Sequence, residues 1–135
     1  MKYCWIIFLV SIFLSCKKEE KFNPDEHITY THWYQLKSNA NDTLFSVYMA
    51  NAFTPNYDGY NDVIGPEGYM NLKTFEVFSR NGTAVYKTSD QNRRWDGRMN
   101  ESQYRVMQGE YVYKIKVNDA AGQEYEYTGS IMLYK

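Results

Sequence analysis

Two stretches near the C-terminal end alternate polar with apolar or aromatic residues, and this period of two constrains the fold more than any other feature. In residues 110–117 (EYVYKIKV), Lys114 and Lys116 fall between large apolar and aromatic side chains. Residues 124–133 (EYEYTGSIML) repeat the alternation. Successive side chains of a β-strand point to opposite faces, so the pattern predicts two half-buried strands. Their inward side chains are expected to be Tyr111, Tyr113, Ile115, Val117, Tyr125, Tyr127, Ile131 and Leu133.

Turn-forming residues separate these strands and their neighbours. Residues 118–122 (NDAAG) supply Gly122, which tolerates positive φ, between the two strands. Asn81-Gly82 lies between the β-formers of 75–79 and 83–86 and predicts a hairpin with a type I′ turn. We find no convincing helical period in the domain. Short strands at this spacing predict an all-β fold, an antiparallel β-sandwich of about seven strands.

The N-terminus has the features of a secretion signal. Lys2 precedes an uncharged apolar run over residues 5–14. The run is shorter than the roughly 20 residues of a membrane-spanning helix and fits the h-region of a signal peptide. Ser15 and Cys16 follow, and then the charged residues 17–20 (KKEE). This junction resembles the lipobox of bacterial lipoproteins, which implies cleavage before Cys16 and acylation of Cys16, for example with palmitate.

We therefore expect a lipoprotein signal peptide over residues 1–15, a lipid-anchored tether over 16–42 and one domain over 43–135. The alternative is an ordinary signal peptide, or a signal anchor, with an incidental cysteine. The run 17–20 also resembles the surface-export signal of Bacteroidetes lipoproteins, which implies the cell-surface side of the outer membrane. A solvated tether on the periplasmic side would carry the same charges.

The tether and its junction with the domain hold three further features. Residues 28–36 are rich in β-formers, so an additional edge strand is one interpretation of this segment. His27 and His32 lie near acidic residues, but a zinc site needs three or four ligands, so we expect no metal there. The sequence Asp-Thr-Leu around Thr43 resembles the short O-glycosylation sequon of Bacteroidetes, which implies glycosylation of Thr43.

From residue 45 onward, five blocks occur in order: 51–62 (NAFTPNYDGYND), 75–86, 95–97 (WDG), 109–113 (GEYVY) and 129–133. Together they resemble the gliding motility-associated C-terminal domain, the type B sorting domain of the type IX secretion system in Bacteroidetes. The resemblance implies an immunoglobulin-like sandwich. The residues that carry it include Asn51, Phe53, Pro55, Asn56, Asp58, Gly59, Asn61, Asp62, Gly82, Trp95, Asp96, Gly97, Gly109 and Tyr111.

The chain departs from the family pattern at a few positions. Tyr57 stands where the family usually has Gly, and Asn81 stands where it usually has Trp. Met107-Gln108 replaces a proline-containing approach to Gly109. The family's domain normally follows a long exported protein, whereas here residues 17–42 alone separate Cys16 from it, so we expect no such cargo in this chain.

Two motifs have both a functional and a structural interpretation. Asn56, Asp58, Asn61 and Asp62 cluster oxygen atoms around Gly59, which suggests a weak Ca²⁺ candidate without EF-hand spacing. A network of Asx-turns explains the same residues, and we favour it. Residues 95–97 have two interpretations. They are either a recognition element or a turn beside a sheet edge, in which Trp95 is buried and Asp96 caps the turn. We favour the buried tryptophan.

Composition and motif content argue against several classes of function. The formal charge of −1 gives no reason to expect nucleic acid. Cys4 and Cys16 lie outside the domain, so a disulfide framework is excluded. We find no nucleophile–base pair and expect no enzyme activity, no small-molecule substrate and no cofactor.

These observations predict a non-catalytic envelope lipoprotein that presents an immunoglobulin-like interaction module. The expected partners are the membrane, through the lipid anchor, and another envelope or secretion-system protein, contacted by loops or by β-augmentation. The family resemblance links the chain to gliding motility or type IX secretion. The alternative function is a C-terminal sorting tag for type IX secretion that is processed after export.

Overall fold

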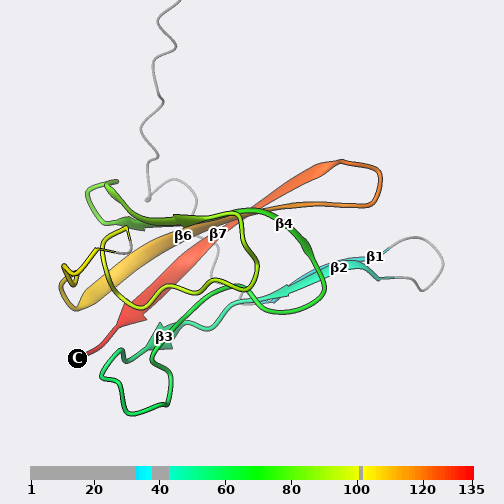
Figure 1. Cartoon of the computed structure of the whole chain (residues 1–135). Coiled ribbons are helices and arrows are strands. Elements are labelled where there is room, and N and C mark those ends of the chain that lie inside the picture. Colours follow the sequence, from blue (N-terminus) through cyan, green and yellow to red (C-terminus); the bar gives the residue numbers. More distant parts are fainter. Residues whose placement is uncertain (1–32, 38–42, 101) are drawn as a thin grey trace, which may run out of the picture.

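The computed structural model describes residues 33–37, 43–100 and 102–135, and strands are the regular elements of this part (Figure 1). The predicted all-β fold is therefore confirmed. The strands are β1 (Trp33–Lys37), β2 (Thr43–Tyr48), β3 (Ala52–Phe53), β4 (Asn71–Ser79), β5 (Ala84–Thr88), β6 (Gly109–Asn118) and β7 (Glu124–Leu133). The strands predicted over residues 110–117 and 124–133 correspond to β6 and β7.

Five strands form the main sheet in the order β3-β7-β6-β4-β5. All neighbours in it are antiparallel except β3, which pairs parallel to β7 through Ala52–Met132 and Phe53–Leu133. The sheet is thus mixed, where the sequence predicted purely antiparallel strands. No tight turn connects β3 to β7, so nothing in the chain connection requires an antiparallel pair.

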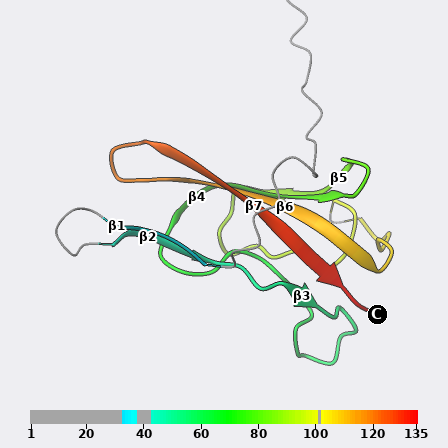
Figure 2. The ribbon, with the colours of Figure 1, turned by 180° about the vertical axis from the view of Figure 1, so that it is seen from behind.

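The second layer consists of the β1–β2 hairpin and the long loops on either side of β4 and β5 (Figures 1 and 2). β1 extends the predicted edge strand by one residue at its C-terminal end, and residues 28–32 lie outside the described part. The core fills the space between the layers. Phe45 of β2 is fully buried and packs on Tyr125 and Tyr127 of β7, with ring centroids 5.2 and 5.9 Å apart.

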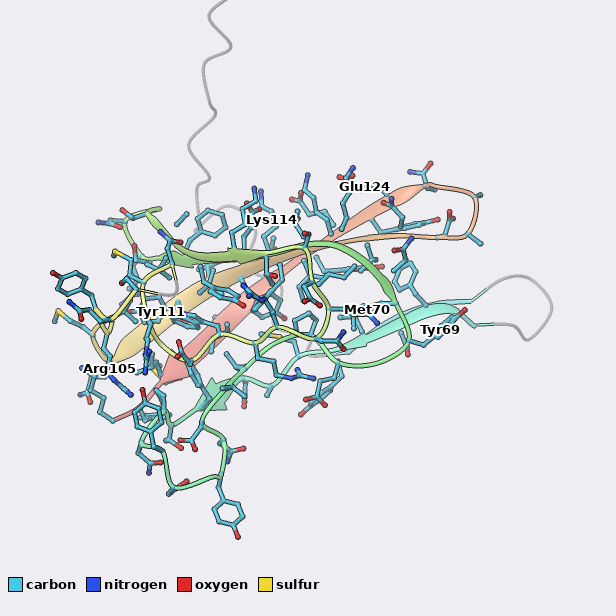
Figure 3. The ribbon with its side chains drawn as sticks, viewed as in Figure 1. Tyr69, Met70, Arg105, Tyr111, Lys114 and Glu124 are labelled. Atoms are coloured by element: carbon cyan, nitrogen blue, oxygen red, sulfur yellow. The ribbon has the colours of Figure 1, made fainter. Side chains whose placement is uncertain are left out.

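The register places the predicted apolar faces together. Tyr111 pairs with Ile131, and Ile115 pairs with Tyr127, so both strands direct these side chains to the core. The opposite face of β4, β6 and β7 carries charged side chains, among them Lys114 and Glu124 (Figure 3). Lys116 bridges Glu124 at 3.1 Å and Glu126 at 3.3 Å across this face.

The hairpin between β4 and β5 forms as predicted, but its turn type is not the predicted one. A type I′ turn needs positive φ at both central residues, whereas Gly82 alone of the Asn81-Gly82 pair has it, at 80°. Gly82 N–H donates to Ser79 O, and Ser79 N–H donates to Thr83 O. These bonds define a type I turn followed by a glycine bulge, a three-residue loop whose last residue is left-handed.

Within the described ranges, no helix has the length and apolar character that crossing a membrane requires.

Candidate functional site

The loop over residues 54–62 is held by its own Asn and Asp side chains. Asp62 accepts hydrogen bonds from Tyr57 N–H (2.6 Å) and Gly59 N–H (2.7 Å), one on each carboxylate oxygen. Asp58 accepts from Tyr60 N–H on Oδ1 and from Asn56 Nδ2 on Oδ2. Asp58 N–H also donates to Asn56 Oδ1, so Asn56 and Asp58 each accept from the N–H two residues further on, as in Asx-turns.

The electrostatics of this loop agree with that arrangement. The hydrogen bond from Tyr60 N–H, together with that from Asn56, lowers the pKa of Asp58 below its usual value. Asn61 contributes its backbone, because its carbonyl accepts from Thr54 N–H at 2.9 Å. Among the described residues, no group of three or more His, Cys, Asp or Glu side chains is placed to hold a metal ion.

Tyr57 adopts a left-handed backbone conformation, with φ of 66°. Such a conformation favours glycine, the residue that the family usually has at this position. Two arginines hold the side chain: Arg105 Cζ lies 4.3 Å from the ring centroid, and Arg98 Nη2 donates to the Tyr57 hydroxyl. The bond from Arg98 lowers the pKa of Tyr57, and the positive charges of Arg105 and Arg98 act in the same direction.

The Trp-Asp-Gly block is part of the core and its nearest turn. Trp95 is 0% exposed and packs between Phe53 and Tyr111, each with a ring-centroid distance of 5.2 Å. Its Nε1–H donates to Arg98 O, while Asp96 Oδ1 accepts from Arg98 N–H. Gly97, with φ of 78°, sits against Pro55 and Leu133. This geometry agrees with the structural interpretation of the block.

The chain just before β6 is also held by a family-motif residue, Tyr111. The Tyr111 hydroxyl donates to the Met107 carbonyl at 2.6 Å. A tyrosine near the start of a strand that bonds to backbone a few residues upstream is the tyrosine corner of immunoglobulin-like sandwiches. Burial raises the pKa of Tyr111, so the hydroxyl keeps its proton and remains a donor. The Tyr111 hydroxyl thus holds the Met107 carbonyl just before β6, whose first residue, Gly109, pairs with Leu133 of β7.

Sequence reasoning missed a cavity of about 390 Å³ at this end of the molecule, between the β4–β5 turn on one side and Met99 with residues 104–107 on the other. Tyr104 is 71% exposed and Met107 78% exposed beside it, and Met99 is also exposed. Arg105 lies at this end, near Tyr111 (Figure 3). The cavity is lined by Ser79, Asn81, Thr83, Val85, Met99, Tyr104, Arg105, Val106, Met107 and Tyr111. Residues 99–107 carry no regular alternation that would have indicated it.

Of the other predicted site residues, the structure describes Thr43, Asn51 and Phe53. Cys16, His27 and His32 lie outside the described residues. Thr43 is the first residue of β2 and pairs with Lys37. The Asn51 carbonyl accepts from Met132 N–H, and the Phe53 carbonyl accepts from Tyr134 N–H, so these two family positions hold β3 beside β7.

The fold and the site geometry define an all-β, sandwich-like domain whose motif residues mainly build its loops and core. The family model that matches is the CHU_C type IX secretion signal domain, over residues 47–133. The chain belongs to this family, which confirms the resemblance found in the sequence. A comparison with curated proteins found no match.

Proposed function

We propose that the domain serves this chain as a secretion signal, by which the type IX secretion system recognises it for export. The match to the type IX secretion signal domain over residues 47–133 carries the proposal. The matched region extends from β2 to the last residue of β7 and includes all five sequence blocks. This sorting function, the alternative in the sequence analysis, has better support than a purely presentational module. Such a signal indicates a secreted or cell-surface protein.

Localisation in two strains tests the export proposal. The full chain is expressed in a bacterium that has the type IX system and in a matched strain that lacks its outer-membrane translocon. Antiserum then detects the chain in medium, on shaved cells and in the periplasm. We expect surface or medium localisation in the first strain and periplasmic retention in the second. The same distribution in both strains would contradict the proposal. A shortened form in the medium would indicate processing after export.

A lipid anchor at Cys16 is a second proposal, and the junction Ser15-Cys16 followed by four charged residues supports it. Anchoring and export are compatible, because the anchor and the domain lie in different parts of the chain. Acyl chains hold a protein by about 0.8 kcal/mol per buried CH₂, so several chains on one cysteine give durable attachment. Labelled palmitate should enter the wild type and not Cys16→Ala. Equal labelling of both would exclude this cysteine as the site.

We propose no catalytic role for the domain. The sequence offers no nucleophile–base pair, and both histidines lie in the segment before it. The partners that we propose are an envelope or secretion-system protein and, through Cys16, the membrane. Hydrolase screens with generic ester, glycoside and peptide substrates on the purified chain should give background rates, and a rate that resists further purification would contradict this.

A further inference from the structure

A buried apolar pair lies on the outer face of the main sheet, the face opposite the core. Phe78 of β4 pairs with Val112 of β6, next to the core-facing pair of Val77 and Tyr113. Because successive side chains of a strand alternate in direction, Phe78 and Val112 point away from the core. Phe78 is 8% exposed and Val112 4% exposed, although neither belongs to the core cluster. Thr128 of β7 faces the same side and is buried as well, and these three residues form an outer patch.

The burial pattern along the strands indicates the same cover. A strand with one solvated face alternates between buried and exposed residues, whereas a strand that is covered on both faces does not. β6 has three buried residues in a row, 111–113, and β4 has two, Val77 and Phe78. Ala84 of β5, which pairs with Phe78, is exposed. The cover therefore lies over β4, β6 and β7 and leaves Ala84 open.

The described layers do not account for this burial. The β1–β2 hairpin and the loop over 89–108 pack on the core face, where Phe45 and Trp95 belong to the core. Figures 1 and 2 show no described layer on the other side of the main sheet. The burial occurs within a single chain, so another part of the same chain is its simplest source.

The part of the chain that can supply the cover precedes Trp33. Besides it, only residues 38–42 and 101 lie outside the described ranges. Residues 38–42 join Lys37 to Thr43, which pair with each other, so this short link belongs to the hairpin of the second layer. The single residue at 101 is too short to cover three strands. The tether before β1 is therefore the candidate.

The tether is long enough to reach the outer patch. Trp33 pairs with Tyr48, and a short link leads from Tyr48 to β3, the edge strand beside β7. The path round this edge to β4 crosses about 10 Å between layers and three strand spacings of about 4.8 Å. Residues 21–32, when extended at about 3.3 Å each, span about 40 Å, which is sufficient for this path.

The composition of this segment fits an apolar patch with polar margins. Residues 21–32 (KFNPDEHITYTH) place Phe22, Ile28 and Tyr30 among polar residues. The outer patch has the same character, because Lys114 follows Val112 on the same face of β6. A segment that is joined to the domain docks at a high effective concentration, so a small apolar contact is enough to hold it.

We propose that residues 21–32 bind across the outer face of the main sheet and cover the outer patch. Ile28 and Tyr30 lie nearer to β7, and Phe22 contacts Phe78 on β4. The inference goes beyond the proposed secretion signal and does not depend on it. Together with the proposed lipid anchor, it leaves residues 17–20 between Cys16 and the bound segment. The tether then holds the domain close to the membrane and does not act as a free spacer.

Thiol labelling tests the cover. In the full chain, Cys4→Ser and Cys16→Ser remove the native thiols, and either Val112→Cys or Ala84→Cys adds one. Maleimide should react about tenfold more slowly with Val112→Cys than with Ala84→Cys, because a buried site reacts only when it opens locally. When a Gly-Ser segment of the same length replaces residues 21–32, the two rates should become similar. Equally slow labelling of Val112→Cys with both tethers would overturn the proposal.

The Gly-Ser variant is compared only after thermal unfolding has shown a cooperative transition. If it does not fold, cross-linking in the chain with its own tether decides. The labelled chains lack Cys16, so a failure of the anchor proposal does not affect this test. Export is measured separately by localisation, so a free outer patch would leave the proposed function standing.

Photo-cross-linking identifies the segment that covers the patch. A photoreactive phenylalanine derivative replaces Phe22 in the full chain, and the control places it at Tyr69, which is exposed and lies away from Lys114 of the outer face (Figure 3). After digestion with trypsin, position 22 should be linked to the peptides 74–80 or 106–114, which contain Phe78 and Val112. The control should be linked to neither. No cross-link from position 22, or one to other peptides only, would overturn the proposal.

A mixture of unlabelled and isotope-labelled chains separates a contact within one chain from a contact between copies. Cross-linked peptides that share one isotope state support the proposal. Peptides of mixed isotope state would mean that a second copy covers the patch, and a link to another envelope protein would mean that a partner does. Either result would overturn the assignment to the chain's own tether.

Discussion

Single residues that carry the family motif have structural reasons for their identity. Gly129 faces Tyr113 of the neighbouring strand, and a Cβ there would lie 2.6 Å from Tyr113 Cζ. Trp95 fills the core between two rings, and Asp62 ties two backbone N–H groups. Tyr57 has a positive φ and stands where the family usually has glycine. Its ring, which a glycine would lack, stacks with Arg105. These motif residues thus specify the shape of the domain.

Gly129→Ala should destabilise the domain, because the new methyl group overlaps a buried phenol ring. Overpacking of this kind costs about 1–3 kcal/mol of unfolding free energy. Gly65→Ala is the control, since its Cβ would meet Arg94 Cγ at an ordinary 3.4 Å. Urea denaturation of both variants measures the difference. Equal stability of the two would show that the sheet opens locally to admit the methyl group.

Tyr111→Phe should lower the unfolding free energy by about 0.5–1.5 kcal/mol, the usual net value of one hydrogen bond. The variant keeps the ring on Trp95 and removes only the donor to Met107 O. Thermal denaturation measures the loss, and hydrogen exchange at residues 106–108 should become faster. Unchanged exchange there would mean that the tyrosine corner does not hold the Met107 segment.

At the scale of elements, pairing across the sheet is supported by charges on its outer face. Lys73 and Lys116 both bind Glu124, so β4, β6 and β7 are joined through one carboxylate. Opposite charges on neighbouring strands favour the observed register, because a slip of one residue would move them to the core face. The same face carries Lys114 beside Glu126 at 3.6 Å.

This arrangement makes stability sensitive to acid. The hydrogen bond from Lys73, followed by that from Lys116, lowers the pKa of Glu124 below its usual 4.5, and the loop N–H groups lower that of Asp58. A carboxyl whose pKa is lower in the folded state stabilises the fold above its unfolded pKa and loses this contribution as the pH falls through the folded value. The melting temperature should therefore fall below about pH 4.5.

Substitution separates the contributions to this acid sensitivity. The double variant Glu124→Gln with Asp58→Asn should start from a lower melting temperature at neutral pH and fall less on acidification. Lys73→Met should have a similar, smaller effect, because it removes the group that lowers the pKa of Glu124 most. Melting curves that fall in parallel for all variants would show that other carboxyl groups cause the acid transition.

At the scale of the whole molecule, the two layers depend on a few large side chains. Phe45 connects the β1–β2 hairpin to β7, and Trp95 connects the loop over 89–108 to the same core. β6 begins and β7 ends at the same end of the sheet, because Gly109 pairs with Leu133 (Figure 1). The cavity lined by Met99, Tyr104 and Met107 lies beside Tyr111 at this end. Its shape therefore depends on the loop being held against the sheet.

Phe45→Ala should destabilise the domain by about 3–5 kcal/mol, the usual cost of removing a buried phenylalanine ring. Phe45→Leu retains most of the apolar volume and should cost less. Chemical denaturation followed by tryptophan fluorescence and by far-ultraviolet circular dichroism measures both. Coincident transitions would show that the layers unfold together, whereas an early fluorescence change alone would mean that the second layer unfolds separately.

The sequence by itself determined the strand content, the inward faces of β6 and β7, the hairpin positions and the family, because each of these depends on local periodicity, turn residues or ordered motifs. Only the tertiary structure decided the parallel β3–β7 pair, the type I turn with its glycine bulge, and the cavity beside Arg105. These depend on which distant segments meet: Arg105 contacts Pro55 and Tyr57, far away in the chain. No local pattern records such contacts, since they arise from packing between layers.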